Sequence, residues 1–203
     1  MARQLPFAEP GPDWHWGMSP DDDDANPGWH VAKDKSWFVC YAPLRGVTAY
    51  PHDNEDPKER LEVAGVGTVM VQLPSTPFKG PRTVHLLKVL HIPEIKYGII
   101  CNKRLEKTEC KKFKVDVDHP SYPNGTVRDT NTNEIVAVFD GNSPVPKRRH
   151  LIVSLHDLSR GDTQGSAAHE DLFPTGECWA QYVTVKEEHW CIIDEAYEHA
   201  PPV

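Results

Sequence analysis

The stretch LEVAGVGTVMVQL, residues 61–73, carries the strongest structural signal in the sequence. It is rich in β-branched residues, and Val63, Val69 and Val71 are expected on one face of a strand, because alternate side chains of a strand point to opposite faces. Gly65 and Gly67 interrupt the run, as glycines do where a strand bends or bulges. The stretch therefore predicts a bent strand in a sheet that curls into a barrel.

Other short apolar runs with strand-like alternation surround this stretch. They are SWFVCY (36–41), TVHLLKVLHI (83–92), YGIICNKRL (97–105), FKVDVD (113–118), GTVRDT (125–130) and EIVAVFD (134–140). Two of the separators, LPSTPFKGPR (73–82) and DHPSYPNG (118–125), are rich in Pro and Gly and are expected to be loops. Many short strands in a row predict a mainly all-β fold, a small closed or nearly closed antiparallel β-barrel.

The chain divides by composition into three parts. Residues 1–28 combine several prolines with a run of four aspartates and show no apolar period, so they are expected to form a flexible, disordered acidic arm. Residues 29–140 are the predicted barrel. Residues 141–203 are expected to be a linker and an extension packing on the barrel; within it, the spacing of apolar residues over 174–199 favours a helix, although YVTV (182–185) equally suits a strand.

Charge and targeting signals limit the classes of function. The net charge of −8 argues against a nucleic-acid-binding protein, which needs a basic face. Neither a signal peptide at the amino terminus nor an apolar run of membrane-spanning length is present in the sequence, so no membrane partner is expected. The five cysteines are odd in number and widely spaced, as reduced thiols would be. An intracellular protein, cytoplasmic or nuclear, is expected.

Three ordered elements of the sequence carry a family resemblance. The first is His30, Val31, Asp34 and Phe38; the second is Val63, Gly65, Gly67, Thr68 and Val69; the third is Leu87, Val89, Leu90, His91, Ile92 and Pro93, followed by apolar Ile99, Ile100 and Leu105. Together they resemble the retropepsin-like β-barrel domain of copia-type retrotransposon Pol polyproteins, the TNT-type Pol barrel. The same elements are similar to those of stand-alone fungal derivatives. The resemblance implies a retropepsin-like barrel, and pairing into a homodimer through the termini.

The resemblance also implies where an aspartic-protease site would lie. In such enzymes each of two subunits contributes an Asp from an Asp-Ser/Thr-Gly triplet, and the two carboxylates share a proton. Counting back from His30 places Asp24 at this position, but Ala25 and Asn26 replace the hydroxyl residue and the glycine. A second register, which aligns Trp29 with the family's tryptophan, leaves no aspartate at the position. Asp24 is thus a degenerate catalytic candidate, and the sequence leans away from an active enzyme.

The leading hypothesis is a transposon-derived, catalytically degenerate barrel that acts as a binding or interaction module, with a groove that could hold an extended peptide by strand addition. The first alternative is an active homodimeric aspartic endopeptidase using Asp24. The second is a barrel that binds or transforms a small molecule, with His30, Asp34, His85 and His91 as candidate binding residues. No metal or other cofactor is expected, because Cys178, His189, Cys191 and His199 match no paired-ligand zinc pattern.

Overall fold

The structure is a computed structural model. It describes residues 15–18, 28–51, 60–73, 82–95, 98–107, 113–116, 121, 125–138, 149–152, 154–155 and 183–203. Most of the predicted acidic arm, with its aspartate run, lies outside these residues. The boundaries of the three predicted parts of the chain stay predictions.

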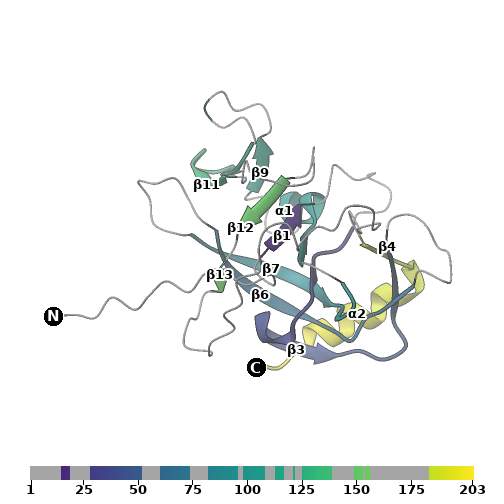
Figure 1. Cartoon of the computed structure of the whole chain (residues 1–203). Coiled ribbons are helices and arrows are strands. Elements are labelled where there is room, and N and C mark those ends of the chain that lie inside the picture. The colour runs from purple at the N-terminus through teal and green to yellow at the C-terminus, as the bar shows by residue number, and fades with distance from the viewer. Residues whose placement is uncertain are drawn as a thin grey trace.

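The described residues form mainly short strands (Figure 1). The main sheet contains β1 (His15–Met18), β2 (Val31–Ala32), β3 (Phe38–Pro43), β6 (Gly65–Leu73), β7 (Arg82–His91), β8 (Gly98–Ile100), β12 (Arg149–Ile152) and β13 (Ser154–Leu155). Two smaller sheets contain β4 (Thr48–Pro51), β5 (Leu61–Glu62) and β14 (Val183–Val185), and β9 (Phe113–Asp116), β10 (Thr126–Asp129) and β11 (Ile135–Val138). The helices are the 3₁₀ turns η2 (Lys35–Trp37) and η3 (Glu187–His189), and α1 (Asn102–Lys107) and α2 (Trp190–Glu198).

The prediction of a mainly all-β fold with a short helix near the C-terminal end is confirmed. The main sheet runs β12-β1-β8-β2-β7-β6-β13, with β3 also paired to β6, and its path is open rather than closed on itself. Most pairings are antiparallel, but β2 is parallel to β7 and β1 is parallel to β8. The segment expected to be an arm thus contributes β1 to the sheet, and the segment expected to be an extension contributes β12 and β13.

Two predicted elements divide where the local hydrogen bonding changes. In the described part of the run YGIICNKRL, residues 98–105, the strand covers Gly98–Ile100 and α1 begins at Asn102, where the Leu105 amide donates to the Cys101 carbonyl at 3.0 Å. The segment 174–199 contains both alternatives that the sequence offered. The strand β14 covers Val183–Val185, and the helix α2 covers Trp190–Glu198.

The central strand β6 is flanked by two β-bulges at the same level. The register of β6 with β3 shifts between Phe38 and Cys40, which gives β3 one extra residue there. The register of β6 with β7 shifts between Gly67 and Val69, and Lys88 on β7 has φ +52°, the left-handed conformation that a bulge can require. Both bulges face the Thr68 region of β6, so the predicted bend is present.

The two glycines of β6 are required by what packs on them. A Cβ atom at Gly65 would come closer than 3.0 Å to the ring of Tyr41. A Cβ atom at Gly67 would overlap the Cys40 carbonyl oxygen and the ring of Phe38. Aromatic rings of β3 therefore pack against the glycines of β6, in the manner by which aromatic side chains stabilise strand glycines.

Hydrophobic side chains are buried on both faces of the sheet. The first core contains Ala32, Trp37, Phe38, Tyr41, Val69, Val71, Val84, Leu86, Val89, Ile100, Leu105, Val115, Val127, Val136 and Ala137. The second core contains Trp29, Val31, Ala42, Leu44, Val47, Ala49, Val63, Val66, Leu90, Ile92, Ile95, Ile99, Val183, Val185 and Ile193. The expectation that Val63 shares a face with Val69 and Val71 is wrong. Val63 precedes β6, where its amide donates to the Val47 carbonyl, so the strand's alternation does not reach it.

Segment 183–203 is anchored to the barrel at several points. β14 pairs with β4, and α2 contacts β3, β6 and β7 (Figure 1). Tyr197 Oη lies 2.9 Å from Thr68 Oγ1, and Lys88 Nζ lies 2.8 Å from Asp194 Oδ1. Both partners on the barrel belong to the region of the two bulges. The bulges therefore present the side chains and the bent backbone on which α2 rests.

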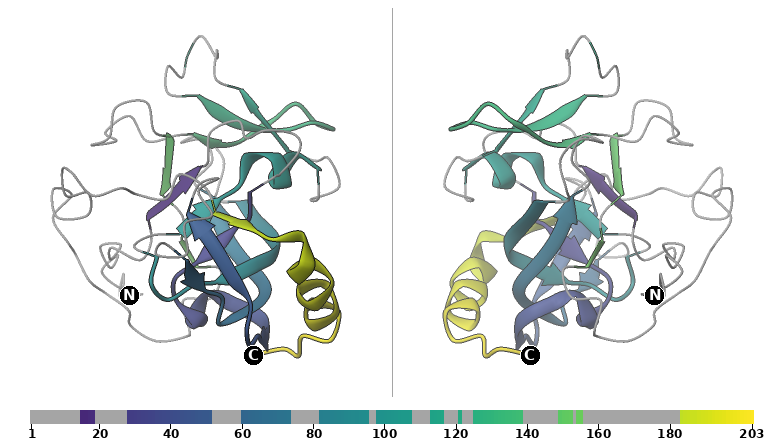
Figure 2. Two further views of the ribbon diagram at one scale, coloured as in Figure 1. Left: turned by 90° about the vertical axis from the view of Figure 1, so that its right-hand side faces the viewer. Right: turned by 90° about the vertical axis from the view of Figure 1, so that its left-hand side faces the viewer.

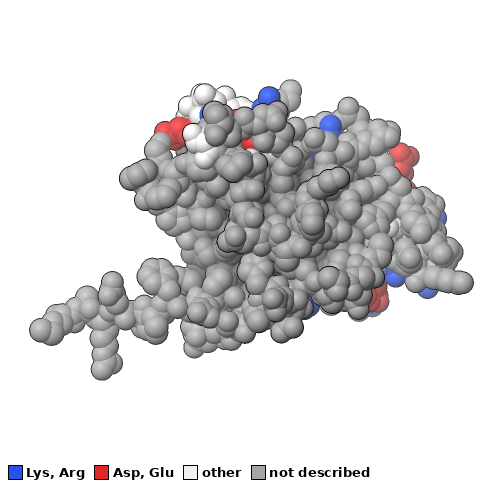
Figure 3. All heavy atoms as spheres, turned by 45° about the horizontal axis from the view of Figure 1, so that its top comes forward, with Lys and Arg blue, Asp and Glu red and all other residues white. Residues whose placement is uncertain are grey.

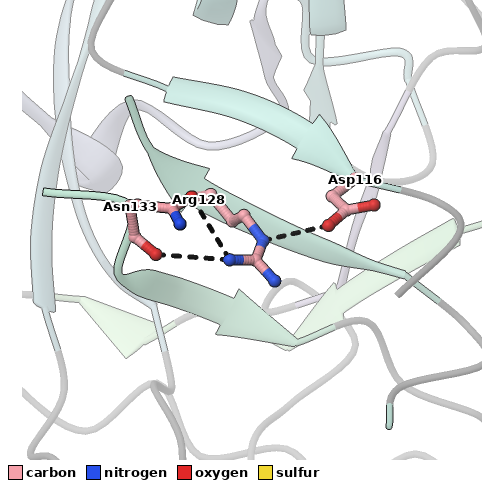
Figure 4. A network of polar contacts seen from close by, with 3 residues as sticks. All are labelled: Asp116, Arg128 and Asn133. Carbon is pink, nitrogen blue, oxygen red and sulfur yellow. Dashed lines mark hydrogen bonds and ion pairs between the residues drawn. The ribbon is translucent and has the colours of Figure 1, made fainter. Parts of the chain in front are cut away.

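The sheet β9-β10-β11 lies at the end of the molecule away from α2 (Figure 2). Arg128 joins its strands, because its Nε donates to Asp116 Oδ2 at 2.9 Å and its terminal nitrogen donates to both oxygens of Asn133 at 3.3 Å (Figure 4). Asn133 has φ +56°, and Asp129 Oδ1 accepts the amides of Asn131 and Thr132. These contacts shape the tight connection between β10 and β11.

On the face drawn in Figure 3, the described Lys and Arg side chains are interspersed with those of Asp and Glu. Among the helices of the described ranges, none has the length and apolar character needed to cross a membrane.

The glycine contacts predict a ranking of alanine substitutions. Gly67→Ala is expected to lower the free energy of unfolding most, by about 3 kcal/mol or more, because the added methyl group meets backbone. Gly65→Ala is expected to cost about 1–3 kcal/mol, since the Tyr41 ring can shift. Gly46→Ala is the control, with φ +72° and nothing within 4 Å, and should cost about 1 kcal/mol. Urea unfolding measures all three, and equal costs would contradict the packing argument.

Candidate functional site

Tyr41 on β3 and His91 on β7 form a buried polar pair beside the start of β6. Tyr41 Oη lies 3.0 Å from His91 Nδ1 and 2.9 Å from the Ala64 carbonyl oxygen. Both residues are largely buried, and the rings of Phe38, Tyr41 and His91 meet edge to face with centroids 5.3–5.8 Å apart. Two features bring the residues together. Gly65 has no side chain and so leaves room for the Tyr41 ring, and Gly65, the first residue of β6, pairs with His91 on β7.

The surroundings of the pair control its protons. Burial lowers the pKa of His91 and is opposed by a hydrogen bond to the Lys33 backbone and by the charge of Asp34, while Lys35 lowers the pKa further. Burial raises the pKa of Tyr41, and Lys35 Nζ lies 4.5 Å from the centre of its ring. The Tyr41 hydroxyl carries one hydrogen, and both the Ala64 carbonyl oxygen and His91 Nδ1 lie within hydrogen-bonding distance of its oxygen, so the tautomer of His91 decides whether Nδ1 donates to Tyr41 or accepts from it.

His30 occupies a different, fully buried place. Its Nδ1 accepts a hydrogen bond from the Cys101 amide at 3.0 Å, which fixes the neutral tautomer with the proton on Nε2. Burial, and secondly the charge of Arg104, lower the pKa of His30 to about 3. Among the residues that the structure describes, Nε2 of His30 finds no hydrogen-bond partner. His30 therefore joins β2 to the start of α1 as a neutral group rather than acting as an acid or base near pH 7.

Arg104 lies against the residues that precede β2. Its guanidinium group stacks on the Trp29 ring, 3.5 Å from the ring centre, and its Nε donates to the Gly28 carbonyl at 2.8 Å. Burial lowers the pKa of Arg104 to about 10, so the group stays positively charged at neutral pH. A desolvated cation in this position attracts negative charge and favours the ionised form of a nearby carboxyl group.

The structure brings together only some of the predicted site residues. His91 and Asp34 are neighbours in the Tyr41 cluster, whereas His30 has partners of its own in Cys101 and Arg104. His85 is exposed on β7, paired with Met70 on β6. Asp24, the candidate catalytic residue, lies outside the described residues. Within the described ranges, no group of three or more His, Cys, Asp or Glu side chains lies together in a way that could hold a metal ion.

Sequence reasoning missed the three residues that organise these surroundings, Tyr41, Lys35 and Arg104. One signal for Tyr41 was available, since an aromatic strand beside a glycine-containing strand favours ring-on-glycine packing. No comparable signal marks Arg104, because its contact with Trp29 joins residues far apart in the sequence.

The buried His30 predicts a pH dependence of stability. Its pKa is about 3 in the folded chain and near 6.5 when unfolded, so the unfolded chain binds the proton first as the pH falls. The stabilisation is complete above pH 6.5 and is lost progressively toward pH 3. Between pH 7 and pH 4.5 the free energy of unfolding of the natural chain should fall by about 2–3 kcal/mol more than that of His30→Gln.

Urea unfolding at a series of pH values measures this difference. Glutamine keeps an oxygen that can accept from the Cys101 amide but does not titrate, and all other titrating groups are shared by the two chains. Parallel pH profiles for the natural chain and His30→Gln would contradict the neutral, buried state of His30.

One family of known proteins matches the part of the chain that contains the Tyr41–His91 pair and the contacts of His30 and Arg104. Searches of curated proteins and of solved structures found no match to the chain. The family model described as "Pol polyprotein, beta-barrel domain" matches residues 24–110, from the candidate Asp24 through the glycine strand β6 to the residues after α1. This part of the chain is therefore similar to the β-barrel domain of Pol polyproteins.

Proposed function

We propose that the chain is a transposon-derived, catalytically degenerate relative of aspartic-protease barrels and that it acts as a binding or interaction module for an extended peptide. The observation that carries the proposal is the outer edge of β3. There the barrel already pairs with a segment distant in sequence, since the Tyr41 amide donates to the Pro201 carbonyl at 3.0 Å. A sheet edge that accepts one extended segment has the geometry needed for peptide recognition by strand addition.

One feature of the sequence supports the loss of catalysis. The triplet Asp24-Ala25-Asn26 lacks the hydroxyl and the glycine that place and hold the carboxylate in the related enzymes. An aspartic dyad works with one proton shared between two carboxylates, so it needs this frame to hold the two groups together.

A proteolysis assay tests the proposal against its main rival. The purified chain is incubated with an unfolded protein substrate from pH 3.5 to pH 7, beside the variants Asp24→Asn and Ala25→Ser with Asn26→Gly. We expect no cleavage that depends on Asp24 in the natural chain, because the carboxylate lacks its hydrogen-bonding frame. The double variant restores the family triplet and shows whether the rest of the barrel can still support chemistry.

Acid-favoured cleavage that disappears in Asp24→Asn would overturn the proposal in favour of an active aspartic endopeptidase. That enzyme requires two Asp24 carboxylates, so its activity should follow the dimer fraction measured by sedimentation. Binding of extended peptides to the chain, without their hydrolysis, is the outcome that supports an interaction module.

A further inference from the structure

The outer edge of β3 is occupied by residues 201–203 of the same chain. β3 pairs with β6 on one side. On the other side, the Tyr41 amide donates to the Pro201 carbonyl at 3.0 Å and the Val203 amide donates to the Val39 carbonyl at 3.1 Å, with Pro202 opposite Cys40 in an antiparallel bridge. We call residues 201–203 the edge segment. It forms a minimal extra strand beside β3.

The two prolines of the edge segment have different consequences. In this register Pro202 occupies a non-hydrogen-bonded position, where its nitrogen points away from β3 and needs no hydrogen. Pro201 occupies a hydrogen-bonded position, where an ordinary residue would return an N–H group to the Tyr41 carbonyl. Pro201 has no N–H group, so it cannot complete this pair. The edge segment therefore lacks one of the hydrogen bonds that an ordinary strand would make to β3.

The edge segment is held less firmly than the helix before it. α2 is attached by the Tyr197–Thr68 and Asp194–Lys88 contacts and by the fully buried Ile193. Residues 201–203 are all exposed, and the exposed fraction of Val203 is 51%. A short segment of exposed residues, held to its neighbour by few hydrogen bonds, opens at low free-energy cost. It can therefore leave β3 while α2 stays in place.

β3 is longer than the edge segment. The strand covers Phe38–Pro43, whereas the hydrogen bonds given for the edge segment within the described residues span Val39 to Tyr41. A longer extended peptide could continue along β3 toward the Pro43 carbonyl, and a residue with an N–H group in place of Pro201 would add the missing hydrogen bond. The favoured ligand has such a residue, then a position where proline is tolerated, then a residue whose N–H group donates to the Val39 carbonyl, as that of Val203 does.

We propose that the edge segment is an internal stand-in for an extended peptide of another protein, and that the outer edge of β3 is the docking surface for that peptide. This inference rests on the proposed function and deepens it, because it places strand addition at one edge and makes the chain's own residues the competitor. Binding then requires exchange of one extended segment for another at Val39 to Tyr41.

The test uses the 203-residue chain and a fluorescein-labelled peptide with the sequence of residues 197–203 (YEHAPPV), in which alanine replaces the first proline. Val203→Pro removes the N–H group that binds the Val39 carbonyl, so it should loosen the edge segment and tighten peptide binding about 2- to 10-fold. Pro201→Ala supplies the missing N–H group, so it should weaken peptide binding by a similar factor.

Pro202→Ala is the matched control. It makes the same chemical change as Pro201→Ala one residue further on, but at a position whose nitrogen points away from β3. It should leave the affinity measured by fluorescence anisotropy unchanged. Amide hydrogen exchange at Tyr41 provides an independent readout, because protection should fall in Val203→Pro and return when the peptide is added.

The outcomes separate this inference from the proposed function. Equal affinities for all four chains, with amide shifts outside Val39 to Tyr41, would overturn the β3 edge as the site while leaving a peptide-binding module. No binding of this or of other extended peptides by Val203→Pro would overturn both. Dimerisation of Val203→Pro in sedimentation, blocking the peptide, would assign the edge to a second copy and overturn the proposed partner.

Discussion

The barrel depends on the close approach of β3 to β6, which is possible only because Gly67 has no side chain. The Cys40 carbonyl of β3 lies where a Cβ atom at Gly67 would be. This approach brings the ring of Phe38 onto Gly67 and the ring of Tyr41 onto Gly65. With the rings in place, the Tyr41 hydroxyl contacts His91 on β7, so one side chain links β3 to β7 across β6. Both rings also belong to the first hydrophobic core.

The two bulges lie beside this close contact between β3 and β6. One extra residue in β3 and one in β7 bend the strands on both sides of β6 at Thr68. The bend turns Thr68 and Lys88 toward α2, where they contact Tyr197 and Asp194. α2 in turn carries the chain to the free side of β3. The glycines, the bulges and the helix are thus linked by direct contacts, and the helix leads the chain into the edge segment.

Local pattern was sufficient for the strand content, because alternation and glycine spacing act over a few residues. It predicted β6 and its bend, and it predicted β3, β7 and β9 to β11 near their observed bounds. It failed for Val63, whose face depends on where β6 begins, and for the end of YGIICNKRL, where α1 starts. Residue type alone grouped His30 with His91, but the two side chains have different partners. His30 is a neutral structural group that accepts from the Cys101 amide, whereas His91 is hydrogen-bonded to the Tyr41 hydroxyl.

The prolines of the edge segment also affect the tendency of the protein to aggregate. A sheet grows from chain to chain when its last strand presents regular N–H and C=O groups to solvent. Here the last strand is the edge segment, and the nitrogen that Pro202 turns outward carries no hydrogen. The strand that covers β3 is therefore itself a poor template for the next one. The barrel can keep an exchangeable edge at its surface without that edge seeding fibres or amorphous precipitate.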